Sequence, residues 1–293
     1  MQAGGSWWKL RWLRCVLLPG SRQHPLFLAM KFRLSSLLIL GVLVWAISPA
    51  ARALPDGEAA TGRLIVRRYA DAIVGVKCSA MLRVTVGDRV LPPNEQKIDI
   101  NGTMIASVGL TVTSLSEIDP RAVFESNRSQ MNTGGMPVEI GKTEFKKVRL
   151  RLADGTEIPA KIVGQDADHD LVFLVPEGAG PGKGTFSFVD LIHTPDSASV
   201  LGNYYLVSRT GEMMQRVPLV RATTLTGIIE RPRRLLLIST DSYADAVGCP
   251  VFDPQGSVVG ICVRYVDKGV PKGTVVIPAA DIAALVPPAP QEN

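Results

Sequence analysis

Short stretches of apolar and β-branched residues recur along this chain between turns rich in glycine, proline and aspartate. The expected strands are 73–78, 81–86, 98–105, 109–113, 148–152, 158–163, 170–175, 200–208, 217–229, 235–239, 251–252, 258–266 and 273–277. Many short strands at regular spacing favour an all-β barrel or sandwich. A glycine-rich joint, residues 177–184, divides the strands into two sets. Residues 59–72 come before them with apolar residues at helical spacing, so we expect a short N-terminal helix and two β-rich halves.

The first 53 residues differ from the rest in composition. They hold seven basic residues, no acidic residue and all four tryptophans. Within them, a basic start at 30–33 leads into the nearly uninterrupted apolar run 34–47, and Ala51-Arg52-Ala53 follows. This order predicts a secretory signal peptide over 30–53, with 1–29 an extension upstream of the true start. The alternative is that 34–47 stays in place as a membrane anchor, although it is short for a span.

The remainder of the chain carries 25 basic and 27 acidic residues, and this balance argues against a nucleic-acid-binding protein. Its cysteines are Cys78, Cys249 and Cys262. Three cysteines cannot all pair, and no spacing among them matches a zinc site. The histidines outside the leader are His169 and His193. We therefore expect neither a metal nor a cofactor.

Two segments lack the strand pattern. Residues 119–147 are polar and without periodicity at their centre, which predicts a mobile surface insertion. Residues 278–286 can form one closing helical turn, and the proline-rich tail 287–293 is expected to be disordered.

Three segments resemble a trypsin-like protease domain, most closely the bacterial HtrA/Deg branch. The first, 102–116, has a glycine turn and then a strand where the family reads Thr-Asn-x-His. The second, 148–175, contains Leu-Ala-Asp-Gly-Thr-Glu-Ile-Pro-Ala-Lys-Ile-Val-Gly-Gln-Asp and then Asp170-Leu171. The third, 245–250, reads Asp-Ala-Val-Gly-Cys-Pro before a hairpin, where the family has Gly-Asn/Asp-Ser-Gly-Gly-Pro. The resemblance covers about residues 60–285.

The resemblance implies a domain of residues 60–286 with two six-stranded antiparallel β-barrels, at about 72–176 and 185–280. The family's active site lies between the barrels. Because the chain ends soon after the second barrel, no PDZ-like domain is expected.

The same resemblance places the family's catalytic His, Asp and Ser at Ser116, Asp170 and Val247. A serine hydroxyl cannot act as the base at neutral pH, and a valine has no nucleophilic atom. Losing such a group lowers turnover on the order of 10⁶-fold, so we expect an inactive serine-protease homologue, a pseudoprotease. The oxyanion-hole N–H groups fall on Asp245 and Val247, and a carboxylate at 245 would oppose developing negative charge.

We accordingly expect an exported protein, periplasmic or extracellular, that binds a peptide or protein partner in the cell envelope. One alternative is an active peptidase in which Cys249 is the nucleophile and His169 or His193 the base. Against it, Cys249 fits the slot of a small buried residue, and His169 directly precedes Asp170 and so points to the opposite face of an extended strand. A second alternative is a structural envelope protein with 119–147 as its interaction surface. The sequence does not identify the partner or the oligomeric state.

Overall fold

The computed structural model describes most of the chain from residue 56 onward. The described residues are 56–121, 124, 136–178, 185–192, 198–239, 244–267 and 270–288. The chain divides into two units, Met1–Ala53 and Leu54–Asn293, and all that follows concerns the second. The expected signal peptide and upstream extension, His193, most of the glycine-rich joint and the end of the tail lie outside the described residues.

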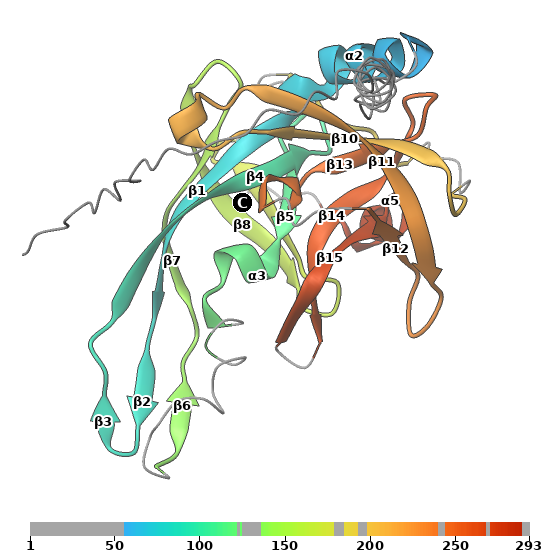
Figure 1. Ribbon diagram of the computed structural model, residues 1–293. Helices are drawn as coiled ribbons and strands as arrows, with labels where there is room; N and C mark the ends of the chain where they lie inside the picture. The colour runs from blue at the N-terminus through green and yellow to red at the C-terminus, as the bar shows by residue number, and fades with distance from the viewer. Residues whose placement is uncertain are drawn as a thin grey trace, which may run out of the picture. The chain divides into compact units, whose positions relative to one another are not determined.

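The first half of the second unit forms a closed antiparallel barrel with the strand order β1-β4-β5-β9-β8-β7 (Figure 1). Its strands are β1 (Ile73–Leu82), β4 (Asn94–Met104), β5 (Thr111–Ser114), β7 (Glu144–Arg151), β8 (Glu157–Asp166) and β9 (Leu171–Pro176). Every residue of β9 is buried, as its continuous apolar sequence predicts. Val76, Leu150 and Leu174 belong to the core inside this barrel.

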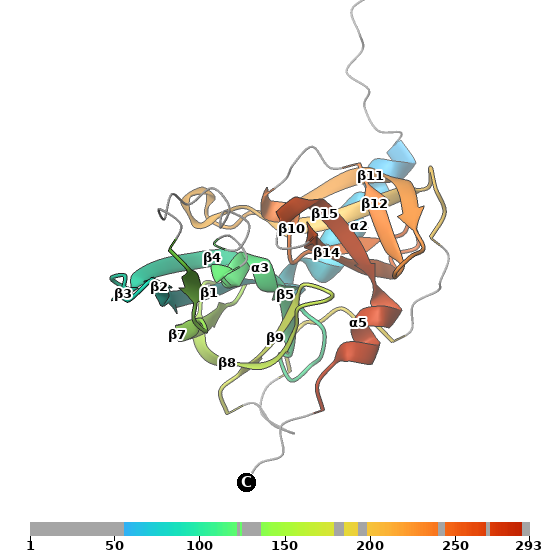
Figure 2. The ribbon, with the colours of Figure 1, turned by 90° about the horizontal axis from the view of Figure 1, so that it is seen from below.

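The second half closes in the same way, in the order β10-β11-β12-β15-β14-β13. Its strands are β10 (Asn203–Arg209), β11 (Pro218–Ile229), β12 (Leu235–Ile238), β13 (Pro250–Phe252), β14 (Val258–Asp267) and β15 (Val270–Pro278). The expected hairpin joins β13 to β14, and Asp253 Oδ1 accepts the N–H groups of Gln255 and Ser257 in its turn. Figure 2 shows the two barrels beside one another. The expected fold class, two six-stranded antiparallel barrels with a short N-terminal helix, is confirmed.

A small third sheet has the order β3-β2-β6 and extends from barrel one. It consists of β2 (Val84–Val86), β3 (Arg89–Val90) and β6 (Val138–Ile140). β6 and the start of β7 fall within the segment 119–147, so the expectation of an insertion without regular structure is wrong for this part. The reason is a small apolar cluster in which Val138 packs with Leu82 and Val84. Residues 122, 123 and 125–135 lie outside the described residues.

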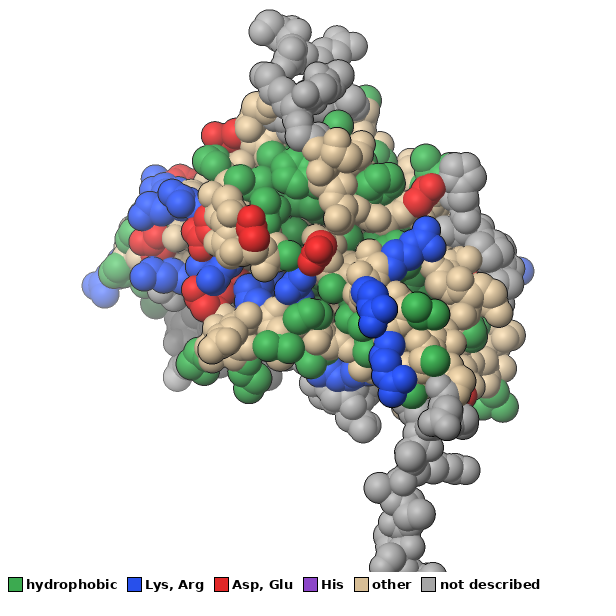
Figure 3. Space-filling view, turned by 90° about the horizontal axis from the view of Figure 1, so that it is seen from above, with side chains coloured by type: hydrophobic (Ala, Val, Ile, Leu, Met, Phe, Trp, Pro, Cys, Tyr) green, Lys and Arg blue, Asp and Glu red, His purple; other side chains and the backbone are tan. Residues whose placement is uncertain are grey.

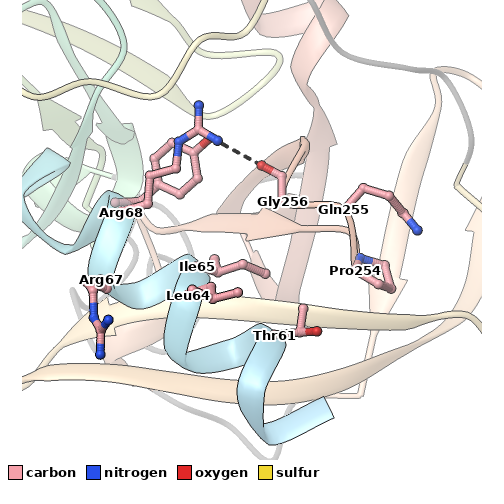
Figure 4. Close-up of a pocket in the computed structure, with 9 residues that line it drawn as sticks. Thr61, Leu64, Ile65, Arg67, Arg68, Pro254, Gln255 and Gly256 are labelled. Atoms are coloured by element: carbon pink, nitrogen blue, oxygen red, sulfur yellow. Dashed lines mark hydrogen bonds between the residues drawn. The ribbon is translucent and has the colours of Figure 1, made fainter. Parts of the chain in front are cut away.

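The N-terminal helix α2 (Asp56–Tyr69) begins three residues before the expected start, and a short 3₁₀ turn, η1 (Ala70–Ala72), follows it. Tyr69 anchors the helix on barrel two, because its ring stacks on Phe252 with 4.5 Å between centroids and its hydroxyl donates to Gly256 O. A groove of about 470 Å³ lies between α2 and the β13–β14 turn (Figure 4). Arginine side chains of α2 are exposed on the molecular face seen in Figure 3, where basic and apolar side chains adjoin.

The chain closes with α5 (Ala279–Leu285), which confirms the expected terminal helical turn. Its residue Ile282 is fully buried against the core of barrel two. None of the helices in the described part of the chain is long and apolar enough to cross a membrane.

Candidate functional site

Ser116 and Asp170 are brought together by the pairing of two strands in barrel one. β5 ends at Ser114, which pairs with Leu171 at the start of β9. The chain then turns into the short helix α3 (Leu115–Ile118). Asp170 directly precedes β9 with a positive φ of 56°, and its carbonyl accepts the N–H of Leu115. The two positions meet as the resemblance implies.

The Asp170 carboxylate is almost fully buried and is surrounded by serine groups. Its Oδ1 accepts the backbone N–H of Ser116 at 2.7 Å, and its Oδ2 accepts the Ser116 hydroxyl at 3.0 Å. The Ser114 hydroxyl also donates to Oδ2. Burial raises the pKa of Asp170 to about 6, although the hydrogen bonds from both serines act in the opposite direction. Hydroxyl and amide donors therefore surround this carboxylate.

The loop that corresponds to the nucleophile loop is held by side chains of β4. Val247 is buried, and the carbonyls on either side of it accept hydrogen bonds from barrel one. Asn101 Nδ2 donates to Asp245 O at 3.0 Å, and Thr103 Oγ1 donates to Gly248 O at 2.7 Å. Gly248 has a positive φ of 79°, and a Cβ there would lie 2.1 Å from Asn101 O. The loop is thus fixed against barrel one by close backbone packing.

The Asp245 carboxylate is turned toward strands β10 and β11. Its Oδ2 lies 2.9 Å from Arg221 Nη2 and accepts the hydroxyl of Ser208 at 3.2 Å. Arg221 therefore compensates the negative charge that sequence analysis placed at the oxyanion position. The carboxylate at 245 is thus paired with a cation of barrel two.

Cys249 lies inside the same loop and is fully buried. Its thiol donates to Asp245 O at 3.2 Å, and Cys262 N donates to Cys249 O across the paired strands. Burial raises the pKa of Cys249 well above its usual range. The ring of His169 contacts Asp166, with Nδ1 3.0 Å from Asp166 Oδ1. These contacts favour the reading of Cys249 as a small buried residue.

We expect iodoacetamide to leave all three body cysteines of the folded protein unmodified at pH 7.5. Burial also raises the pKa of Cys78 to about 11 and that of Cys262 to about 12, so few thiolates are present to react. Mass spectrometry of the native and the urea-unfolded protein measures this, and unfolding should expose every thiol. Rapid labelling of Cys249 alone in the native protein would support a cysteine nucleophile.

Arg264 is a residue of this site that sequence reasoning missed. Its backbone N–H on β14 donates to Ser114 Oγ at 3.2 Å, and its guanidinium pairs with Glu117 on α3. Barrel two is thereby joined to the serine groups around Asp170. Ser114 was within reach of sequence analysis, because it occupies the Asn position of the family's Thr-Asn-x-His pattern. Nothing in the sequence marks Arg264, since its partner lies 147 positions away.

No cluster of three or more histidine, cysteine, aspartate or glutamate side chains in the described ranges could hold a metal ion. What the Asp170 site presents instead is a carboxylate with hydroxyl and amide donors. The geometry provides hydrogen-bonding groups at the junction of the two barrels and no positioned imidazole among the described residues.

Comparisons with known proteins agree with this architecture. The family model of the trypsin-like peptidase domain matches residues 101–261. Among solved structures, the chain is similar to Deg5, with 16% identity and a TM-score of 0.50, covering 79% of this chain and 94% of that one. It is also similar to the protease domain of MamO from Magnetospirillum magneticum in its apo form, with 16% identity and a TM-score of 0.45, covering 75% of this chain and 98% of that one. No curated protein sequence matches the chain significantly.

The two closed barrels and the family match define the class of this molecule as a two-barrel peptidase-fold protein. The match spans more than half of the chain. This chain belongs to the trypsin-like peptidase domain family.

Proposed function

We propose that this protein is a pseudoprotease that binds extended peptide segments at the junction of its two barrels without cleaving them. The observation that carries the proposal is the set of donors around Asp170. Ser116 fills the place of the base with a hydroxyl, which cannot accept a proton from a nucleophile near neutral pH. Val247 at the nucleophile position has no atom that can attack a carbonyl.

Peptide binding does not need a nucleophile or a base, because it uses the backbone N–H and C=O groups at the edge of a sheet. β14 pairs with β13 as far as Ile261, and Cys262 N donates to Cys249 O just beyond. By the alternation of an antiparallel ladder, the next groups on this edge belong to Arg264 and, after the shift of the β14–β15 register between Tyr265 and Val266, to Val266. The N–H of Arg264 is taken by Ser114, so its carbonyl and the N–H of Val266 remain to pair with an added strand.

The proposed place of action is outside the cytoplasm. The basic start, apolar run and Ala-x-Ala sequence of residues 30–53 support export to the periplasm or the extracellular space. The partner is accordingly a peptide or protein of the cell envelope.

The test combines a cleavage assay and a binding assay on the purified protein. We expect no hydrolysis of fluorogenic casein above buffer, and saturable binding of unfolded casein peptides by biolayer interferometry. Val266→Pro removes the edge N–H and should weaken binding at least tenfold, whereas Val90→Pro on the exposed edge strand β3 should not. Thermal melts establish that both variants fold. Turnover that disappears on Asp170→Ala would refute the loss of catalysis, and equal binding by both proline variants would refute the binding edge.

A further inference from the structure

Strands β7 and β8 lie on the side of barrel one that faces away from barrel two (Figure 2). The two strands pair only at Arg149↔Pro159, Leu150↔Ile158 and Arg151↔Glu157. Beyond these pairs they diverge and border a hollow of about 510 Å³.

The divergence leaves part of the β8 edge without a strand partner. Pro159 O accepts the N–H of Glu177 on the β9 side, so the alternation of the ladder turns the backbone groups of Ala160 and Ile162 toward the hollow. The β7–β8 pairing has ended before these residues. An unpaired edge of this kind is the usual acceptor of an added peptide strand.

The outer rim of the hollow is basic, whereas its floor is apolar. Lys147, Arg149 and Lys161 line it and are exposed, and Phe145, Val148 and Ile162 are its partly buried apolar residues. Arg149 is only loosely paired, with Nη1 3.7 Å from Glu157 Oε2. Within the described part of the chain, no ion pair holds Lys147 or Lys161. Glu177 is the one acidic residue in the lining.

We propose that this hollow, the β7–β8 hollow, is a second binding site, for an extended peptide of a partner protein with alternating acidic and apolar residues. The peptide adds to the β8 edge through the backbone groups of Ala160 and Ile162. Successive side chains of a strand point to opposite faces, so its acidic side chains meet the lysines while its apolar ones cover the floor. The site is separate from the edge of β14 and does not depend on it.

The test measures binding of a fluorescent octapeptide of alternating glutamate and valine to the full chain by fluorescence anisotropy. We expect saturable binding that weakens as salt rises from about 50 to about 500 mM, because added salt shortens the Debye length, about 10 Å at 0.1 M and about 3 Å at 1 M, and so screens the charges. Lys147→Glu and Lys161→Glu should each weaken it about tenfold, since reversal removes an attraction and adds a repulsion. The matched control Lys97→Glu changes the same charge on β4, outside the hollow, and should have little effect. Amide hydrogen exchange of residues 158–164 should slow in the complex.

Four results would overturn the proposal. Equal binding of the peptide with glutamine in place of glutamate would remove the role of charge. Equal weakening of peptide binding by Lys97→Glu would indicate non-specific attraction. Unchanged amide hydrogen exchange over 158–164 would indicate the same. Tighter binding after deletion of residues 289–293 would identify the chain's own tail as the occupant. The variant Val266→Pro should leave this binding unchanged, which separates this site from the one under Proposed function.

Discussion

Replacing Gly248 by alanine is expected to destabilise the protein by about 4 kcal/mol or more, which corresponds to a fall in Tm of about 10 °C. The new Cβ would lie 2.1 Å from Asn101 O and 2.5 Å from Thr113 Oγ1, and φ at this position is positive. Backbone atoms cannot yield as a flexible side chain does, so the loop must move and lose its hydrogen bond from Thr103. Urea denaturation of the purified variant measures the effect.

Gly155 provides the matched control for this substitution. It also has a positive φ, 88°, yet no heavy atom lies within 4 Å of a Cβ built there. Gly155→Ala should therefore cost only about 1 kcal/mol from backbone strain. Comparable losses in the two variants would show that the close approach of the loop to β4 contributes nothing.

Asp170→Asn is expected to stabilise the protein at pH 8, by about 2 kcal/mol. Burial raises the folded pKa of Asp170 to about 6, above the unfolded value near 3.8. A raised pKa in an acid means that the native state holds the proton more tightly, so stability is highest below about pH 4 and falls as pH rises to about 6. Two pKa units correspond to about 3 kcal/mol, and part of this is offset because asparagine accepts hydrogen bonds less strongly. Urea unfolding at pH 8 and at pH 4.5 measures the difference, which should disappear at the lower pH.

Asp166→Asn is the control with the opposite sign. Hydrogen bonds from His169 help to hold the pKa of Asp166 below its usual value despite partial burial. Its stabilising contribution is present above the unfolded pKa, so its removal should cost stability at pH 8. If Asp170→Asn also destabilises at pH 8, the site favours the ionised carboxylate, as a working triad would require.

Most of the fold could be predicted from the sequence because the strand signals are local. The alternation in 148–152 and 158–163, the apolar run before Pro176 and the turn at Asp253 each depend on neighbouring residues, and each became a strand or a turn. β6 was missed because its three residues are stabilised by contacts with Leu82 and Val84, which lie far away in the chain.

For the candidate site, the sequence predicted which positions take part but not which contacts their side chains make. The motif spacing located Ser116, Asp170 and the 245–250 loop, but it gave no information on what each group contacts. The ion pair between Asp245 and Arg221, and the contacts of Arg264 with Ser114 and Glu117, join segments from separate parts of the chain. Such pairs carry no periodic signal, so only the three-dimensional arrangement reveals them.

Asn101 and Thr103 hold the 245–248 loop by hydrogen bonds to its backbone carbonyls. These bonds have a consequence for how the sequence of such a chain can change during evolution. The loop joins the halves of the molecule through its main chain and through a glycine, and neither contribution uses a reactive side chain. Selection for a stable scaffold therefore preserves the conformation of the loop, whether or not the molecule turns over a substrate. The residue at 247 can therefore change, whereas Gly248 cannot. A lineage without catalytic activity would still inherit the loop conformation that catalysis requires.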